Sequence, residues 1–267
     1  MQVQEKQGDE VDKEEIYSIS ISRAYHFYMA GDHEKSFTYN KELAEYASKV
    51  RGDLDIAERC YKRAIADAKY LGRLQDEMDY LLDMTINVYS VWGRYEEALS
   101  NYQSLLKHYD KVGDSGMRAR VLNNIAWIHD NKGEYDQALK LYNESLETTR
   151  KLGDQKGIAR TLNSMGEIYR QRGEYDQAMD LCNQSLEISK QIGDQEGISG
   201  TLHNIAVIHN RKGEYEEALS HALGAYKILE RLKSPELDRS VELLSDIKQR
   251  VGRETYQRLV EKVEKSQ

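Results

Sequence analysis

Apolar residues recur at helical spacing along the chain, in segments of roughly 18 residues that single glycines separate. Within residues 113–152, two apolar stripes follow each other, at Leu122, Ile125, Ala126 and His129 and then at Ala138, Leu141, Tyr142 and Leu146. Residues three and four positions apart lie on one face of an α-helix, so each stripe predicts one amphipathic helix. The pattern therefore predicts a pair of helices joined by short turns.

The helix pair is a repeat with a period of 40 residues. Residues 113–152 and 153–192 are identical at 18 of 40 positions, and residues 153–192 and 193–232 at 13 of 40. Each copy begins with Gly-Asp and has Gly-Glu-Tyr twenty residues later. A weaker copy precedes these three in the same register, and a fifth is detectable from Gly52 to Ile65 if about one residue is inserted. A fixed period of this length indicates a protein built from stacked repeats.

The residues between the stripes have the chemistry of helix ends. A glycine just past a helix can adopt the left-handed conformation that closes the helix. An aspartate directly after it can accept hydrogen bonds from the first amides of the next helix. One such pair of helices cannot bury its apolar faces alone, whereas a stack of pairs can. We therefore expect an all-α fold of stacked antiparallel helix hairpins.

The pattern also divides the chain into parts. Residues 1–12 are polar and predicted to be disordered, and residues 13–72 are predicted to form divergent helical repeats, with a helix from Asp12 to Ala30. Four repeats follow at 73–112, 113–152, 153–192 and 193–232. Residues 233–267 are predicted to form C-terminal capping helices, the first of which begins at Ser234-Pro235 and stops at Gly252. A partner-binding tail is the alternative interpretation of these last helices.

These repeats resemble the tetratricopeptide repeat family. Its small residue on the first helix, where the second helix crosses closely, corresponds to Ala126, Gly166 and Ala206. The flat residue three positions later corresponds to His129, Tyr169 and His209, with Tyr89 in the weaker copy. The alanine of the second helix and the residue four positions on correspond to Ala98/Tyr102, Ala138/Tyr142, Ala178/Cys182 and Ala218/Ala222.

Two features depart from the usual family pattern: the period is 40, and Gly-Asp stands in place of a proline. They are similar to the long-helix subclass found in polarity adaptors, kinesin light chains and prokaryotic regulatory proteins. The resemblance implies a right-handed α-solenoid that binds protein partners.

Composition and charge narrow the partners. The formal net charge is −8, which disfavours a nucleic-acid partner because the phosphate backbone is also negative. The sequence has no apolar run of the length that spans a membrane and no visible secretory signal. We expect a cytoplasmic protein that binds neither nucleic acid nor membrane. Its two cysteines, Cys60 and Cys182, are too few for a disulfide framework or a zinc cluster.

No constellation of residues indicates catalysis. The glycines stand singly at helix ends, so none forms a phosphate-binding loop. His129 and His209 occupy the packing position that Tyr169 holds in the sister copy, and Cys182 occupies a core position. We expect a protein without enzymatic activity, metal or cofactor.

The resemblance implies that a partner binds in the concave groove, on the side of each first helix that faces away from the second helix. The residues implied for partner binding are Arg120, Asn123, Asn124, Trp127, Arg160, Asn163, Glu167, Arg170, His203 and Asn204. A carboxamide has donors and an acceptor, so a row of asparagines can pair with the backbone of a bound peptide. The alternative is that these are simply solvated residues of a wet helix face.

One subtype of the family clamps the carboxylate of a chaperone C-terminus with a fixed pattern of bases and asparagines. Arg120 and Asn124 match its start, but Ser164 stands where an asparagine is needed and Gly200 where a base is needed. Chaperone C-termini are therefore not predicted partners.

The leading functional hypothesis is a non-catalytic scaffold or adaptor that holds an extended or helical segment of another protein. The alternative is a sensor or regulatory module that controls a separate protease, ATPase or transcription regulator. Self-association through imperfectly capped ends is a third interpretation.

Overall fold

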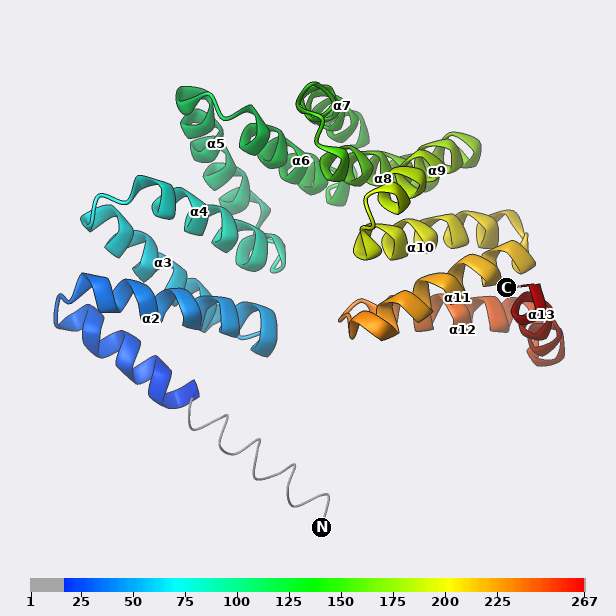
Figure 1. Cartoon of the computed structure of the whole chain (residues 1–267), viewed down its shortest axis with the longest axis horizontal. Coiled ribbons are helices and arrows are strands. Elements are labelled where there is room, and N and C mark those ends of the chain that lie inside the picture. The colour runs from blue at the N-terminus through cyan, green and yellow to red at the C-terminus, as the bar shows by residue number, and fades with distance from the viewer. Residues whose placement is uncertain (1–16, 267) are drawn as a thin grey trace, which may run out of the picture. The chain divides into compact units, whose positions relative to one another are not determined.

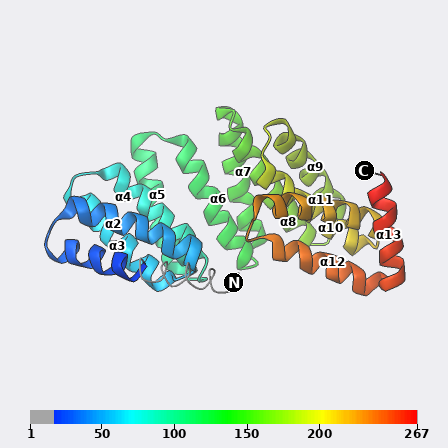
Figure 2. The same ribbon diagram turned by 60° about the horizontal axis from the view of Figure 1, so that its bottom comes forward.

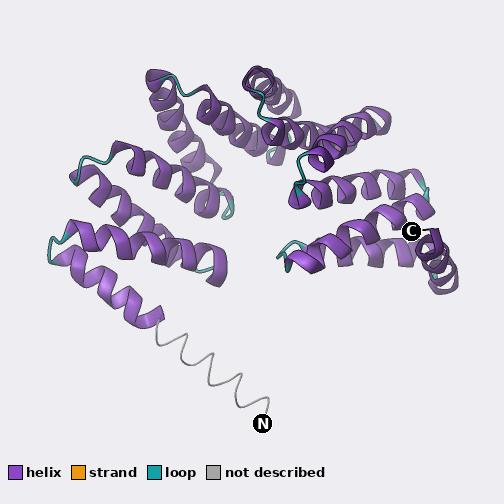
Figure 3. Cartoon of the chain, viewed as in Figure 1, coloured by secondary structure: helices purple, strands orange, loops and turns teal. Residues whose placement is uncertain are grey.

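The computed structural model describes residues 17–266, and the side chains of residues 17–263; every regular element in this part of the chain is a helix (Figures 1 and 3). Residues 1–16, including those predicted to be disordered and the start of the first helix, lie outside the described residues. The chain divides into two compact units, residues 1–113 and 114–267. The predicted all-α fold of stacked hairpins is confirmed in each unit. Among the described residues no helix is both long enough and apolar enough to cross a membrane.

The first unit begins with a helix over residues 17–29 and continues with two hairpins. Two of its helices, α2 and α4, end in π-helical turns, labelled η1 and η2. The elements are α2 (His33–Tyr46), η1 (Ala47–Arg51), α3 (Leu54–Tyr70), α4 (Leu74–Met84), η2 (Thr85–Ser90) and α5 (Tyr95–Val112).

The second unit holds the three clear repeats and the C-terminal helices (Figure 2). The first helices of its repeats are α6, α8 and α10, and each is followed by the second helix of the same hairpin. The elements are α6 (Ser115–Asn131), α7 (Tyr135–Leu152), α8 (Gln155–Gln171), α9 (Tyr175–Gln191), α10 (Gln195–Lys212), α11 (Tyr215–Leu232), α12 (Leu237–Val251) and α13 (Arg253–Ser266). Because α8 contacts both α6 and α10, the first helices form a continuous row.

The predicted turn chemistry is present at the helix junctions. Ten glycines from Gly31 to Gly213 have φ between 67° and 81°, the left-handed region that glycine adopts without a steric penalty. Asp114 and Asp154 then accept hydrogen bonds from the third residue of the next helix, at 2.9 Å each. Asp194 differs, because its side chain makes no capping bond and lies 3.7 Å from Lys156 Nζ instead.

Two π-helical turns explain the irregular spacing of the first unit. Successive left-handed glycines are 20 residues apart from Gly93 to Gly213, but 21 apart from Gly31 to Gly52 and from Gly72 to Gly93. Each longer segment contains one π-helical turn, η1 or η2. A π turn takes up one extra residue without breaking the helix, so the following residues keep their face. The one-residue insertion seen in the sequence is thus absorbed inside a first helix.

The small position of each first helix lies at a close helix crossing, as the family pattern implies. Ala126 and Ala206 are fully buried. At Gly166 an added Cβ would lie 2.8 Å from Cys182 Sγ and 3.2 Å from the Ala178 carbonyl oxygen, which leaves no room for a larger residue. Cys182 is fully buried, and burial raises its pKa to about 12, so it is a core thiol as predicted.

The two repeat histidines do more than fill the core. Nδ1 of His129 lies 2.5 Å from Glu134 Oε2, and Nδ1 of His209 lies 2.6 Å from Glu214 Oε2. Each pair joins the last turn of a first helix to the Gly-Glu-Tyr turn that follows. The hydrogen bond from His129 is the main reason that the pKa of Glu134 is lowered. The predicted packing position is correct for His129, which is buried, whereas His209 is half-buried.

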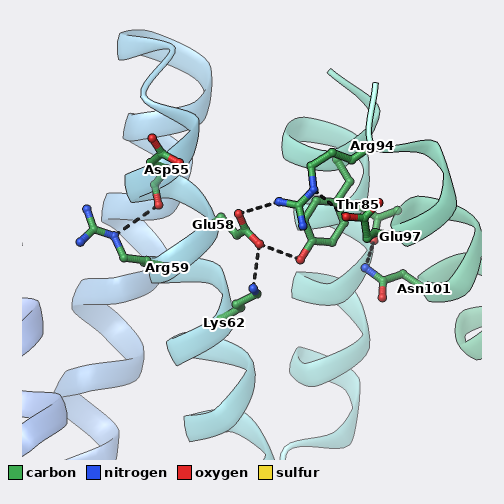
Figure 4. A network of polar contacts seen from close by, with 9 residues as sticks. Asp55, Glu58, Arg59, Lys62, Thr85, Arg94, Glu97 and Asn101 are labelled. Carbon is green, nitrogen blue, oxygen red and sulfur yellow. Dashed lines mark hydrogen bonds and ion pairs between the residues drawn. The ribbon is translucent and has the colours of Figure 1, made fainter. Parts of the chain in front are cut away.

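A polar network joins the two hairpins of the first unit (Figure 4). The Glu58 carboxylate of α3 accepts hydrogen bonds from Tyr89 Oη at 3.0 Å and Arg94 at 2.9 Å, and it pairs with Lys62 at 2.7 Å. Burial acts to raise the pKa of Glu58, but the hydrogen bonds from Lys62 and Tyr89 outweigh it and lower the pKa. Glu58 thereby ties α3 to the end of the next first helix.

The C-terminal helices continue the repeat pattern. Leu243 and Ile247 of α12 pack in one cluster with Ala206, Ala218 and Ala222 of the preceding repeat. Helix α12 contacts α10, as α10 contacts α8. It begins at Leu237 rather than at the predicted Pro235, because Ser234 Oγ accepts a hydrogen bond from the amide of Glu236 and forms a tight turn there.

Lys233 offers a test of the junction chemistry. It lies 20 residues after Gly213 and is the one described residue other than glycine with positive φ, at 50°. An L-residue in this conformation is strained by roughly 1–2 kcal/mol. We expect Lys233→Gly to raise the free energy of unfolding by about 1 kcal/mol and Gly193→Ala to lower it by a similar amount. Urea denaturation measures both, and equal stability of all three proteins would contradict the assignment.

The Glu58 network gives a second stability prediction. Glu58→Ala removes the acceptor of three donors, so we expect it to lower the free energy of unfolding by about 1–2 kcal/mol. Glu97→Ala removes a carboxylate that bonds to Arg94 at 2.9 Å on an exposed surface, and we expect it to lower stability clearly less than Glu58→Ala does. If both variants lose the same stability in urea denaturation, Glu58 does not tie the hairpins together.

Candidate functional site

The row of first helices in the second unit lines a cavity of about 660 Å³. Residues of α6, α8 and α10 line it, together with Leu229 of α11, the turn before α12 and the first residues of α12. The lining residues are Trp127, Asp130, Asn131, Asn163, Ser164, Glu167, Gln171, Glu196, Ser199, Gly200, His203, Asn204, Leu229, Ser234, Pro235, Glu236, Arg239 and Ser240. Most of the lining residues are polar, and most come from α6, α8, α10 and α12, which follow one another at intervals of one repeat.

Half of the site residues implied by the sequence line this cavity, namely Trp127, Asn163, Glu167, His203 and Asn204. Arg120, Asn123 and Arg160 line a neighbouring cavity of about 320 Å³, nearer the start of α6 and α8. Arg160 and Asn163 also line a smaller one of about 210 Å³. Asn124 and Arg170 line none of these three cavities.

The asparagines link neighbouring first helices instead of standing as a free row. Asn123 Nδ2 donates to Thr161 Oγ1 at 2.8 Å, and Asn204 Nδ2 donates to Asn163 Oδ1 at 3.1 Å. Asn123 and Asn204 are each only 8% exposed. Since one side of each first helix faces the next first helix, carboxamides on that side pair across the repeat boundary. Asn163 is half-buried and lines the cavity.

Helix α12 contributes residues to the cavity that the repeat pattern did not predict. Ser234, Pro235, Glu236 and Arg239 were assigned to a capping helix, yet all four line the cavity. The repeat period contains the signal that could have found them: Arg239 and Ser240 follow Ser199 and Gly200 by 40 residues. Helix α12 thus takes the place of a further first helix and also covers apolar surface.

Burial shifts the pKa values of two side chains in the cavity wall, Asp130 and His203. Asp130 Oδ1 is buried without a hydrogen-bond partner. Burial, and then the nearby Glu167 carboxylate, raise the pKa of Asp130 to about 6. Burial also lowers the pKa of His203 to about 4, with help from Arg239, so His203 is neutral at pH 7.

Glu167 and Arg170 form a close ion pair on α8. Burial opposes the charge of Glu167, but the hydrogen bond from Arg170 outweighs it and lowers the Glu167 pKa. Arg170 is therefore committed to Glu167 and does not stand free for a partner.

This arrangement is a scaffold of helix hairpins with a polar cavity along its first helices, and comparison with known proteins identifies its class. The sequence matches the tetratricopeptide repeat over residues 87–151, 131–191 and 157–231, which together cover more than half of the chain. The chain belongs to the tetratricopeptide repeat family. A comparison with curated proteins gave no match.

Solved structures show the same fold at low sequence identity. BtubC from P. vanneervenii is 23% identical with a TM-score of 0.61, and the match covers 81% of this chain and 89% of that one. NprR in complex with its cognate peptide NprX is 19% identical with a TM-score of 0.63, covering 98% and 83%. A signal-transduction ATPase with a tetratricopeptide repeat sensor from Pyrococcus horikoshii is 17% identical with a TM-score of 0.62, covering 95% and 42%.

Asp130 gives a prediction about stability and pH. Its pKa in the folded state, about 6, lies above the ordinary value near 3.9, so the folded protein binds its proton more tightly than the unfolded chain. Asp130 therefore lowers stability as the pH rises from about 4 to 6, and the loss is complete above pH 6. We expect Asp130→Asn to be more stable than the natural protein at pH 7 by about 1 kcal/mol, a value reduced for partial solvent screening.

The difference between the two proteins should shrink toward pH 4, where Asp130 is protonated in the folded state and about half-protonated in the unfolded chain. Urea denaturation at pH 4, 5.5 and 7 measures it. Asp180→Asn, at an exposed position on α9, is the matched control and should leave stability unchanged at all three values. A variant of Asp130 that loses stability at pH 7 would contradict the prediction.

Proposed function

We propose that the protein is a non-catalytic scaffold that binds a polypeptide segment of a partner along the first helices of its second unit. The observation that carries the proposal is the cavity of about 660 Å³ that α6, α8, α10 and α12 line together. A site of this size that extends from α6 through α8 and α10 to α12 suits an elongated ligand. Its wall offers backbone-pairing groups such as the Asn163 carboxamide, together with charged side chains and the exposed ring of Trp127.

Two proteins with this fold support the choice of ligand. NprR has been solved with its cognate peptide NprX, and a Rap protein has been solved in complex with Competence and Sporulation Factor. The Rap protein is 12% identical to this chain, with a TM-score of 0.53. These likenesses are in fold alone, so the proposal rests on the cavity of this chain. The NprR complex is an example of this fold with a bound peptide.

Gly200 makes the proposal testable without damaging the fold. It occupies the repeat position that Arg120 and Arg160 hold in the two preceding repeats. It lines two cavities. A Cβ added at Gly200 would meet nothing within 4 Å, so a larger side chain has room to extend into the cavity. Gly200→Tyr adds bulk there without adding charge, and replacing a glycine inside a helix does not weaken the helix.

The experiment selects ligands from a synthetic library of random heptapeptides that are acetylated and amidated at their ends. We expect the natural protein to select peptides whose affinity falls at least about tenfold with Gly200→Tyr, because the tyrosine fills space the peptide needs. Fluorescence anisotropy of the selected peptides measures the dissociation constants. Gln184→Tyr, at an exposed position on α9 outside the cavity, is the control and should bind as the natural protein does. Peptides that bind all three proteins equally would contradict the proposal.

A further inference from the structure

The cavity of about 660 Å³, called the large cavity below, has an excess of negative charge. Four carboxylates line it, those of Asp130, Glu167, Glu196 and Glu236, against the single guanidinium of Arg239. Two of the four have a partner of their own, because Glu167 pairs with Arg170 and Glu236 pairs with Arg239 at 3.0 Å. His203 is neutral at pH 7 and adds no positive charge. The charge left without compensation lies at Asp130 and Glu196.

Asp130 is the more informative of the two carboxylates. It is half-buried near the end of α6, and its Oδ1 atom is buried and makes no hydrogen bond. The opposing charge that acts on its pKa is that of Arg170, which is already paired with Glu167. A buried carboxylate without a partner destabilises a fold. A cation supplied by a ligand would offset this cost by forming an ion pair with the carboxylate. Trp127, one turn earlier on the same helix, lines the same cavity and is 40% exposed. An aromatic ring beside a carboxylate is a favourable environment for a guanidinium or ammonium group.

The other charged groups that line the cavity or act on Asp130 also favour a positively charged ligand. They are Glu167 and Arg170 on α8, His203 and Glu196 on α10, and Glu236 and Arg239 at the start of α12. The two arginines are each bonded to a glutamate. Arg120 and Arg160 lie around the neighbouring cavity instead, which Asp114 and Asp154 also line. The charged side chains of the lining therefore favour a cation in the large cavity and leave the neighbouring one balanced.

We propose that the bound segment carries an arginine or lysine side chain that forms an ion pair with Asp130 inside the large cavity. This inference rests on the proposed function, and it names the chemistry of the partner at one position. The ligand group would therefore be positively charged, whereas a clamp of arginines and lysines selects the negative carboxylate of a chain terminus. The stability that Asp130 costs the free protein is recovered when the cation arrives.

The test uses the heptapeptides selected as described above, whose blocked ends ensure that any positive charge comes from a side chain. We expect the selected peptides to be rich in arginine and lysine. Asp130→Asn should weaken their binding roughly ten- to a hundredfold, the range of one charge-assisted hydrogen bond. Asp180→Asn on the exposed face of α9 should have no effect.

A change in the peptide provides evidence that does not depend on the folding of a variant. Replacing the critical arginine by citrulline keeps its shape and removes its charge, and we expect the same loss of affinity. The two changes together should cost little more than either alone, because both remove one interaction. Binding should also be about tenfold weaker at pH 5 than at pH 7.5 for the natural protein, since Asp130 is then mostly protonated, and unchanged for Asp130→Asn.

The outcomes separate this inference from the proposed function. Peptides that are sensitive to Gly200→Tyr but bind Asp130→Asn normally would overturn the ion pair and leave the peptide-binding site in place. A set of peptides sensitive to Gly200→Tyr and rich in aspartate or glutamate would overturn the inference in the same way. Failure to find any peptide sensitive to Gly200→Tyr would overturn both.

Discussion

The structure of each unit depends on the fact that a two-helix hairpin of this length cannot bury its own apolar residues. One cluster of the second unit shows how the neighbour solves this, since Tyr142 of one hairpin packs together with Leu162 and Met165 of the next. Tyr142 is completely buried only because α8 covers it. Each hairpin therefore stabilises its neighbour, and the last one needs a further element, which α12 supplies with Leu243 and Ile247.

Stacking also determines which polar residues of the first helices pair with one another and which line the cavity. The side of each first helix that faces the next one becomes a second, polar contact between repeats, where Asn123 bonds to Thr161 and Asn204 to Asn163. These bonds satisfy the carboxamides and hold successive helices in register. The strip beyond them, with Trp127, Asp130, Glu167 and His203, lines the cavity instead. Asp130 is exceptional in this strip because it is desolvated without a partner.

The first unit uses the same hairpins with a different internal adjustment. Each of its first helices contains a π-helical turn that accommodates one extra residue before the closing glycine. In η2 the hydroxyls take part: Thr85 Oγ1 donates to the Leu81 carbonyl at 2.6 Å and accepts from Asn101 at 3.0 Å, while Ser90 Oγ donates to the Thr85 carbonyl at 2.9 Å. Tyr89, which lies in the same π-helical turn, donates a hydrogen bond to Glu58 at 3.0 Å.

The sequence by itself determined the helix pairs, their turns and their stacking, because these depend on local chemistry that recurs every 40 residues. Gly153 must take a left-handed conformation and Asp154 must cap a helix wherever the neighbours lie. Only the tertiary structure decided what each polar residue of the first helices contacts. Asn123 and Asn124 are adjacent in sequence, yet one bonds to the next helix and the other does not, since a turn of 100° per residue separates their directions. The role of Arg239 in the cavity likewise required the fold, because it depends on where α12 packs against α10.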